Sequence, residues 1–276
     1  MKVLIVKNLT FKNCNKIVKS FTSVLNNNKI GFNEIDVEFL NDINNYKSIK
    51  TKYDIIVTFG GDGTIISVTK LANYLNTPIM GINLGHIGFL TSITEKDNFK
   101  DIVSNLKNKK YFIEKRNLLK GEIYRNDKLL YTSISLNDIT LASSLYSKMG
   151  KYDLYLDDYL FNEYRSDGLI VSSVTGATGH TLSAGGPIVS PKVPAFIITA
   201  ICPHALNQRS LVVSDNTIIK ITIKNNGQIC DYDGREQYEL LYNDSVVIKR
   251  YNKQISFINF DKNFLYNSIK NKIRLF

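Results

Sequence analysis

The chain has 276 residues, of which 43% are hydrophobic and 22% are charged. This length suits two domains better than one compact core, and this composition argues against a disordered chain. The longest apolar runs, such as residues 195–202, are too short to span a bilayer, and three scattered cysteines argue against a disulfide framework or a structural zinc site.

The formal net charge of +10 favours anionic partners, although a generally basic surface explains it equally well. The sequence has no aromatic RNA-binding signature and no Cys/His finger, so we expect no nucleic-acid partner. It has no bilayer-spanning run, so we expect no membrane partner either. The first residues turn polar too early for a signal peptide, and we expect a cytoplasmic protein.

Residues 1–110 alternate strand and helix patterns. Apolar runs at residues 2–7, 35–40, 53–59 and 78–83 predict strands. Helical spacing of apolar residues at 17–25 and 65–75 predicts two helices, and the second is stopped by Thr77-Pro78. This alternation predicts a Rossmann-like α/β domain with a parallel sheet and right-handed crossovers.

From residue 111 to 255 the pattern changes to short segments rich in Tyr, Ile, Val and Thr, with turn signals about every ten residues. This pattern predicts an antiparallel all-β domain. The spacing of Phe264, Leu265, Ile269 and Ile273 predicts an amphipathic helix within residues 256–276. We expect this last segment to return to the first domain and pack on it.

The stretch at residues 60–64, GGDGT, stands between a predicted strand and a predicted helix. Such a loop exposes backbone amides and a helix N-terminus to an anion, and Thr64 is predicted to cap the helix. A carboxylate there would repel a phosphate unless Asp62 accepts a hydroxyl proton or holds Mg²⁺. A tight turn with Asp62 as turn-former is the other explanation. The sequence has neither GxxxxGK[ST] nor GxGxxG, which disfavours a P-loop NTPase or an ordinary Rossmann dehydrogenase.

Three further stretches place polar groups in unusual settings. Residues 81–90 (GINLGHIGFL) alternate glycines with apolar residues, which indicates a closely packed loop or a simple bend. Asn137-Asp138 interrupts a β-rich run, where it forms either a turn or a pair that binds ribose hydroxyls or an adenine edge. Residues 165–187 are dense in Gly, Ser and Thr, whose hydroxyls and open amides suit the wrapping of a nucleotide.

Together, and in this order, these motifs resemble the NAD kinase family. The stretches PHALNQRSLVV and DYDGRE further along the chain also resemble that family, so the resemblance extends from residue 2 to about residue 236. It implies an α/β domain followed by a β domain. It also implies transfer of a phosphoryl group from ATP to the 2′-hydroxyl of the adenosine ribose of NAD, giving NADP. Mg²⁺ or Mn²⁺ as metal ion and a homodimer or homotetramer are implied as well.

The resemblance also assigns roles to individual residues. Asp62 would contact or activate the 2′-hydroxyl, while Asn137 and Asp138 would hold NAD and Asp167 would read the adenine or its partner nucleotide. The full set of nucleotide-binding residues carried over is Gly60, Gly61, Gly63, Thr64, Asn83, Asn137, Asp138, Arg165, Asp167, Thr178, Gly179, His180, Ser183 and Asp233.

Residues 173–180 depart from the family pattern Thr-Pro-Thr-Gly-Ser-Thr-Ala-Tyr. This chain has Val174 in place of the proline that fixes φ, Ala177 in place of the serine, Gly179 in place of the alanine, and His180 in place of the tyrosine. The departures bear on substrate affinity and on preference between NAD and NADH. Two alternatives remain: a lipid kinase of the diacylglycerol or sphingosine type, which shares GGDGT, and a non-catalytic NAD(P)-binding sensor.

Overall fold

The structure is a computed structural model that describes residues 1–85, 88–144, 149–205 and 207–272. The chain divides into two compact units. Unit 1 comprises Met1–Lys115 and Ile255–Phe276, and unit 2 comprises Arg116–Gln254. The chain passes between the units within two long strands, β6 (Phe112–Arg125) and β17 (Ser245–Asn259), rather than within loops.

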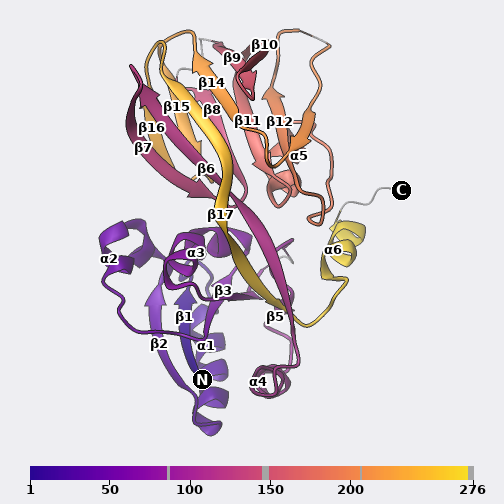
Figure 1. The fold of residues 1–276 in the computed structure, drawn as a ribbon. Coiled ribbons are helices and arrows are strands. Elements are labelled where there is room, and N and C mark those ends of the chain that lie inside the picture. The colour runs from indigo at the N-terminus through magenta and orange to yellow at the C-terminus, as the bar shows by residue number, and fades with distance from the viewer. Residues whose placement is uncertain (86–87, 145–148, 206, 273–276) are drawn as a thin grey trace. The chain divides into compact units, whose positions relative to one another are not determined.

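Unit 1 alternates strands with helices along the chain (Figure 1). Its elements in chain order are β1 (Lys2–Lys7), α1 (Cys14–Asn27), β2 (Gly31–Asp36), the 3₁₀ helix η1 (Val37–Asn41), α2 (Ile43–Lys47), β3 (Ile55–Gly60), α3 (Asp62–Leu75), β4 (Ile79–Asn83), β5 (Ile93–Thr94), α4 (Phe99–Lys107) and α6 (Phe264–Lys272).

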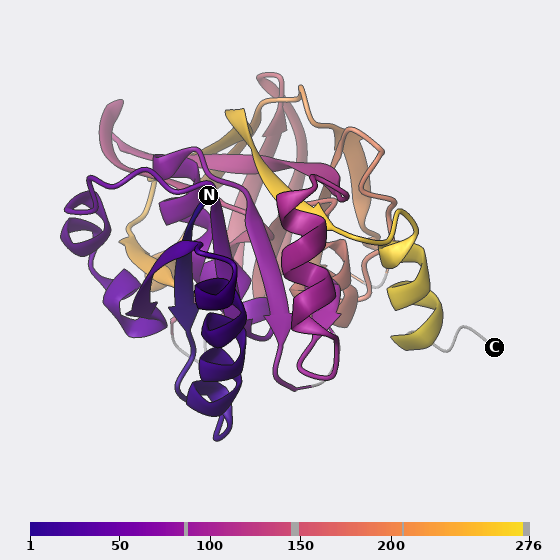
Figure 2. The same ribbon diagram turned by 90° about the horizontal axis from the view of Figure 1, so that it is seen from below.

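The strands of unit 1 form a parallel sheet in the order β4-β3-β1-β2, and β5 pairs with β4. Helices α1 and α4 lie side by side (Figure 2). The ring of Phe21 in α1 packs edge-on against the ring of Phe99 in α4, with 5.3 Å between the ring centroids. Apolar side chains of both helices join those of the strands in one buried cluster. Adjacent residues of a strand point to opposite faces of the sheet, and β3 and β4 are buried at every position. Strands buried on both faces need apolar side chains at nearly every position, which explains the continuous apolar runs.

One predicted strand of unit 1 was wrong. The apolar residues within 35–40 predicted a strand there, but β2 ends at Asp36 and residues 37–41 form the 3₁₀ helix η1. Within the part of the chain that the structure describes, β2 is an edge strand that pairs only with β1, and most of its side chains are at least partly exposed. Its polar residues Asn33 and Glu34 therefore gave no apolar signal, while the apolar residues of the following short helix did.

The C-terminal residues belong to unit 1. Phe257 of β17 pairs in parallel with Ile79 of β4, and α6 follows. Of the residues that predicted the last helix, Phe264, Leu265 and Ile269 lie within α6, whereas Ile273 lies outside the described residues. Among the described residues, every helix is too short or too polar to cross a bilayer.

Unit 2 is a β-sandwich. One sheet has the order β10-β9-β14-β17, with β6 pairing with β17 and β7 with β6, and the second has the order β13-β12-β11-β8-β15-β16. Besides β6 and β17, the elements are β7 (Lys128–Ser135), β8 (Asp138–Ser143), β9 (Gly150–Leu156), β10 (Tyr159–Ser166), β11 (Gly168–Ser173), the 3₁₀ turn η2 (Gly176–Thr178), α5 (His180–Ser183), β12 (Ala195–Ile201), β13 (Leu211–Ser214), β14 (Ile219–Ile223), β15 (Gln228–Tyr232) and β16 (Glu236–Leu240).

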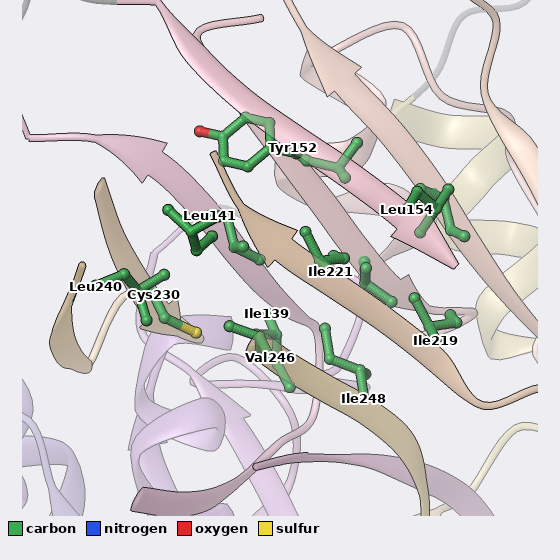
Figure 3. Packing of buried hydrophobic residues seen from close by; sticks show 14 of the residues in the cluster. Ile139, Leu141, Tyr152, Leu154, Ile219, Ile221, Cys230, Leu240, Val246 and Ile248 are labelled. Carbon is green, nitrogen blue, oxygen red and sulfur yellow. The ribbon is translucent and has the colours of Figure 1, made fainter. Parts of the chain in front are cut away.

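The core of unit 2 lies between its two sheets. Figure 3 shows Leu141 and Cys230 of one sheet facing Ile221 and Val246 of the other, and all four side chains are fully buried. Buried and partly exposed residues alternate along β14 and β15, which places every second side chain in this layer. The predicted fold class, an α/β part followed by an antiparallel β part, is confirmed.

A buried carboxylate, Glu122, fastens β6 to β17 in unit 2. It accepts hydrogen bonds from Lys120 on its own strand and from Lys249 on β17, the latter at 2.9 Å. Burial alone would raise the pKa of Glu122, but the bonds from the two lysines outweigh burial and lower the pKa to about 2. Because the folded-state pKa lies below the ordinary value of 4.5, this carboxylate stabilises the fold above about pH 4.5, and the stabilisation is lost as the pH falls toward about 2.

We predict that Glu122→Gln lowers the free energy of unfolding at pH 7 by about 2 kcal/mol, because two charged hydrogen bonds are lost from a buried site. The difference from the unaltered chain narrows as the pH falls from 4.5 toward 2. Denaturant unfolding at several pH values measures both effects. Glu239→Gln, at an exposed position, is the control and should change neither the free energy of unfolding nor its dependence on pH. A Glu122 effect that stays constant with pH would contradict the assignment.

Candidate active site

Asp62 is the first residue of α3 and follows β3 by a single glycine, Gly61. β3 and β4 are parallel neighbours, and their last residues, Gly60 and Asn83, are paired in register. The loops that leave these two strands therefore begin at the same level of the same sheet edge, where α/β proteins place their ligands. The structure thus brings together the motifs at residues 60–64 and 81–90. Within the second motif, His86 and Ile87 lie outside the described residues.

The Asp62 carboxylate is held by this neighbouring loop. The backbone N–H of Phe89 donates to Oδ2 at 2.6 Å, and that of Leu90 donates to Oδ1 at 3.1 Å. Gly88 lies so close that a Cβ at this position would overlap the carboxylate. Among the described residues, Oδ2 accepts this one hydrogen bond from Phe89 and keeps a second lone pair, so Asp62 is oriented by the chain and can still accept a hydrogen bond from a ligand. The residue is partly exposed, so its carboxylate is within reach of a ligand.

The other residues of GGDGT divide into two groups. Gly61 and Gly63 are partly or fully exposed, whereas Gly60 is buried against Thr64 and Asn8. The prediction that Thr64 caps the helix was wrong: the helix begins at Asp62, its N-cap is Gly61, and the Thr64 hydroxyl is buried and accepts from the Asn8 side chain at 3.0 Å. A threonine two residues after the first helical residue is too far along the chain to cap it.

Asn83 is the last residue of β4 and is 1% exposed, so it lies behind the loops rather than at their surface. Its Nδ2 donates to the Thr91 hydroxyl at 2.7 Å, and its Oδ1 accepts from the backbone N–H of Gly85 at 2.7 Å. The structure therefore places Asn83 near Asp62, with its side chain bonded to the protein's own loop.

Unit 2 carries a cavity of about 440 Å³ on the strands β8, β15 and β16, a size typical of small-ligand sites. Four of the residues predicted from the sequence line it together: Asn137, Asp138, His180 and Asp233. The other lining residues are Thr140, Ala142, Ile229, Asp231, Gly234 and Gln237. The structure thus gathers residues from three sequence motifs around one acidic hollow.

Asn137 connects two of these motifs. Its carbonyl oxygen accepts from the Ser173 backbone N–H at 2.8 Å and from the Ser172 hydroxyl at 3.1 Å, and a Cβ on Gly176 would overlap that oxygen. The Gly-rich segment at residues 173–180 is therefore folded directly onto Asn137. The side-chain Oδ1 of Asn137 is buried and meets no hydrogen-bond donor among the described residues. Such an acceptor costs free energy unless a ligand donates to it.

Asp233 orients the backbone that carries Asn137. Its carboxylate is turned inward and accepts three backbone N–H groups, those of Leu136 at 2.7 Å, Asn137 at 2.8 Å and Asp138 at 3.0 Å. Burial raises the pKa of Asp233 to about 7, and the three amides oppose this shift. Asp233 itself has a left-handed φ of 57° and precedes Gly234. The residue, which the sequence predicted to bind nucleotide, lines the cavity, and its carboxylate holds the backbone of residues 136–138.

Asp138 begins β8 and is 7% exposed. Burial raises the pKa of its carboxyl, while the hydrogen bond donated by Thr140 at 3.0 Å and the nearby His180 act in the opposite direction. His180 is exposed at the start of α5 and faces the same cavity. The residue that departs from the family tyrosine thus stands opposite the carboxylate of the Asn137-Asp138 pair.

The remaining predicted residues lie outside this cavity. Arg165 is exposed on β10 and lines a separate small hollow with Lys151 and Lys224, and Asp167 is exposed between β10 and β11. Thr178, Gly179 and Ser183 are part of the η2–α5 segment. Thr178 donates to the Thr175 carbonyl at 3.4 Å, and Ser183 is exposed.

Sequence reasoning missed several contributors. The backbone amides of Phe89 and Leu90 carry no side-chain signal, and Asp231 and Gln237 look like ordinary polar residues of exposed strands. The alternation along β15 and β16, which turns Asp231 and Gln237 to one face, is the signal that could have found them. Among the described residues, no three His, Cys, Asp or Glu side chains gather as a metal site.

Both units match models of one enzyme family. The ATP-NAD kinase N-terminal domain matches residues 7–111, and the ATP-NAD kinase C-terminal domain matches residues 136–260. The chain therefore belongs to the ATP-NAD kinase family. The family and the class of enzyme predicted from the motifs are thereby confirmed.

Individual relatives agree. The NAD kinase of Caldanaerobacter subterraneus subsp. tengcongensis is 37% identical over 227 residues, which covers 82% of this chain and 80% of that protein. The NAD kinase of Caldicellulosiruptor bescii is 34% identical over 277 residues, covering 99% and 100%.

Two solved structures share the fold. The crystal structure of yeast NADH kinase complexed with NADH has a TM-score of 0.87 at 24% identity, covering 99% of this chain and 87% of that one. The crystal structure of an NAD kinase from Archaeoglobus fulgidus in complex with ATP has a TM-score of 0.78 at 24% identity and covers both chains completely.

We predict that Gly88→Ala lowers turnover by about 100-fold, because the new methyl group displaces the Asp62 carboxylate from the two amides that orient it. The control is Gly31→Ala, since a Cβ on Gly31 meets no atom within 4 Å. Steady-state turnover and thermal unfolding of both variants are the measurements. Full turnover in Gly88→Ala would show that the position of Asp62 is not critical.

Proposed function

We propose that the chain transfers the γ-phosphoryl group of ATP to the 2′-hydroxyl of the adenosine ribose of NAD, forming NADP and ADP. The observation that carries this proposal is the Asp62 carboxylate, oriented by two backbone amides at the start of a helix and still able to accept a proton. Membership of the ATP-NAD kinase family supplies the identity of the substrates.

In the proposed reaction, Asp62 accepts the proton of the 2′-hydroxyl as that oxygen forms a bond to the γ-phosphorus. The bond between the γ-phosphorus and the bridging oxygen breaks, and ADP leaves with that electron pair. Phosphoryl transfer asks little covalent chemistry of a protein, so placement of the hydroxyl and neutralisation of charge dominate. Gly61 and Gly63, which leave the loop backbone accessible beside the N-terminus of α3, are proposed to face the phosphates.

The unit 2 cavity is proposed to bind NAD. The buried Oδ1 of Asn137 suits a hydroxyl or amino donor of the nucleoside, and Asp138 offers a second acceptor beside it. His180 is proposed to lie against the ligand. Proposed binding roles also remain for Thr64, Arg165, Asp167, Thr178, Gly179 and Ser183.

Three further features belong to the proposal on the strength of the family resemblance: Mg²⁺ or Mn²⁺ as metal ion, a homodimer or homotetramer, and a cytoplasmic location. A hard cation in such enzymes takes one or two carboxylates together with substrate phosphates, and the partly exposed Asp62 is a carboxylate of the right kind for it. The ion would offset negative charge on the phosphates.

The first test is NADP formation by the purified chain with NAD, ATP and Mg²⁺. We predict that Asp62→Asn lowers kcat by about 100-fold or more, the usual scale for a general base, while thermal unfolding shows an intact fold. Asp101→Asn, an exposed acid of α4, is the matched control and should retain full activity.

Other outcomes favour the other candidates. Folded protein that binds NAD in calorimetry yet forms no NADP would be a dinucleotide sensor. Phosphorylation of diacylglycerol or sphingosine instead of NAD would be lipid kinase activity. Unchanged turnover in Asp62→Asn would remove Asp62 from the mechanism and leave the overall reaction intact.

A second prediction concerns NAD binding. Asparagine at position 233 has one acceptor oxygen, so Asp233→Asn leaves at least one of the three backbone N–H groups facing an NH₂ group, and residues 136–138 shift. We expect KM for NAD to rise about tenfold, with a smaller effect on KM for ATP.

The control for Asp233→Asn is Asp127→Asn, since Asp127 also has a left-handed φ, 61°, and lies exposed in the β6–β7 turn. Asparagine tolerates a left-handed φ, so any backbone effect of the substitution should be the same at both positions. An effect found only at position 233 is therefore due to loss of the carboxylate. An equal effect on KM for NAD in both variants would count against the role of Asp233.

A further inference from the structure

Two buried polar side chains stand behind Asp62. Asn83 and Thr91 are each 1% exposed, and the Thr91 hydroxyl lies 3.5 Å from Asp62 Oδ1. Neither packing in the apolar core nor capping of a helix explains why the chain has two buried polar side chains at this place. Their hydrogen bonds form a directed chain that ends at the carboxylate.

Backbone donors fix the direction of this chain. The Gly85 N–H donates to Asn83 Oδ1 at 2.7 Å, so the amide of Asn83 cannot be flipped, because an N–H group cannot accept from an NH₂ group. Asn83 Nδ2 therefore points to Thr91 and donates to its hydroxyl oxygen at 2.7 Å.

The Thr91 hydroxyl has two lone pairs and one proton. Asn83 Nδ2 and the Gly88 N–H, at 3.2 Å, both donate to the oxygen and occupy both lone pairs. The single proton is then left to donate, and the acceptor that the structure gives it is Asp62 Oδ1. A hydroxyl that could rotate in another setting is held here as a donor aimed at the carboxylate.

We propose that Thr91 is a positioning residue for phosphoryl transfer, and that Asn83 acts through Thr91 rather than by contact with the nucleotide. The inference rests on the role proposed for Asp62. Together with the amides of Phe89 and Leu90, the Thr91 hydroxyl gives the carboxylate a third donor from the same loop. At 3.5 Å this bond is long, and it limits rotation of the carboxylate away from the two amides when the ribose hydroxyl arrives.

The test is a double-mutant cycle. Thr91→Val keeps the shape of the side chain and removes the hydroxyl, and we expect it to lower kcat about tenfold while KM for NAD and for ATP change less than about twofold. Thr91→Ser restores the hydroxyl and should recover most of kcat. In the Asp62→Asn background, Thr91→Val should cost nothing further, because the group on which it acts is already lost.

The control is Thr69→Val, which removes an equally buried hydroxyl of unit 1 that bonds to the Ile65 carbonyl within α3. It should leave kcat unchanged. An equal loss of kcat from Thr91→Val in both backgrounds, or a loss that appears as a raised KM, would overturn the inference.

Amide hydrogen exchange provides a readout that does not depend on turnover. Thr91→Val should speed exchange at Phe89 and Leu90 by about tenfold, because the carboxylate that accepts their N–H groups is less restrained. Unchanged exchange at both amides would reject the positioning role even if no NADP formation were found. Failure of the proposed reaction is recognised separately, by the absence of NADP formation in the unaltered chain.

Discussion

The parallel pairing of β3 with β4 is the constraint on which the Asp62 site depends. The register sets Gly60 opposite Asn83, and the backbone N–H of Leu84 continues the pairing by donating to the Gly60 carbonyl at 3.1 Å. The two following loops therefore leave the sheet together, and one loop can hold the side chain of the other. The backbone amides of Phe89 and Leu90 orient the Asp62 carboxylate without a side chain of opposite charge. The sheet sets the separation of the two loops, and with it the distance from these amides to the carboxylate. A shift of register by one residue would separate the carboxylate from the amides of Phe89 and Leu90.

Carboxylate-to-amide bonding serves opposite purposes in the two units. In unit 1 the amides belong to a supporting loop, and the carboxylate of Asp62 is the group that is presented. In unit 2 the carboxylate of Asp233 is turned inward, and the backbone of residues 136–138 is the group that is presented. Backbone groups have no rotamers to lose, so each arrangement fixes a polar group with little further cost in conformational entropy. Burial of the Asp233 carboxylate raises its pKa to about 7, and the hydrogen bonds from the three backbone amides offset part of this effect.

The sequence predicted those features that repeat along the chain and missed those that depend on which segments meet. Apolar runs located β1, β3 and β4, because strands buried on both faces must be apolar at nearly every position. The edge strand β2 is only partly buried and escaped detection. Asp62 and Asn137 stood out by residue type within unusual motifs. Thr91 did not, because a threonine after an apolar run is common in strands and loops, and only the fold shows that both its lone pairs are occupied.

The glycines near Asp62 and Asn137 have close contacts within the protein itself. Their smallness in GGDGT suggests room for phosphates and a sugar, yet a methyl group on Gly60 would first overlap Thr64, and one on Gly88 would first overlap Asp62. In unit 2, a methyl group on Gly176 would first overlap the Asn137 carbonyl. These glycines are required by close packing within the protein, which must be complete before any ligand arrives. Gly61 is partly exposed and Gly63 is exposed, so the two glycines that directly flank Asp62 are the ones that leave room for a ligand. The glycines of these motifs therefore serve the packing that holds the Asp62 carboxylate as well as access of a ligand to it.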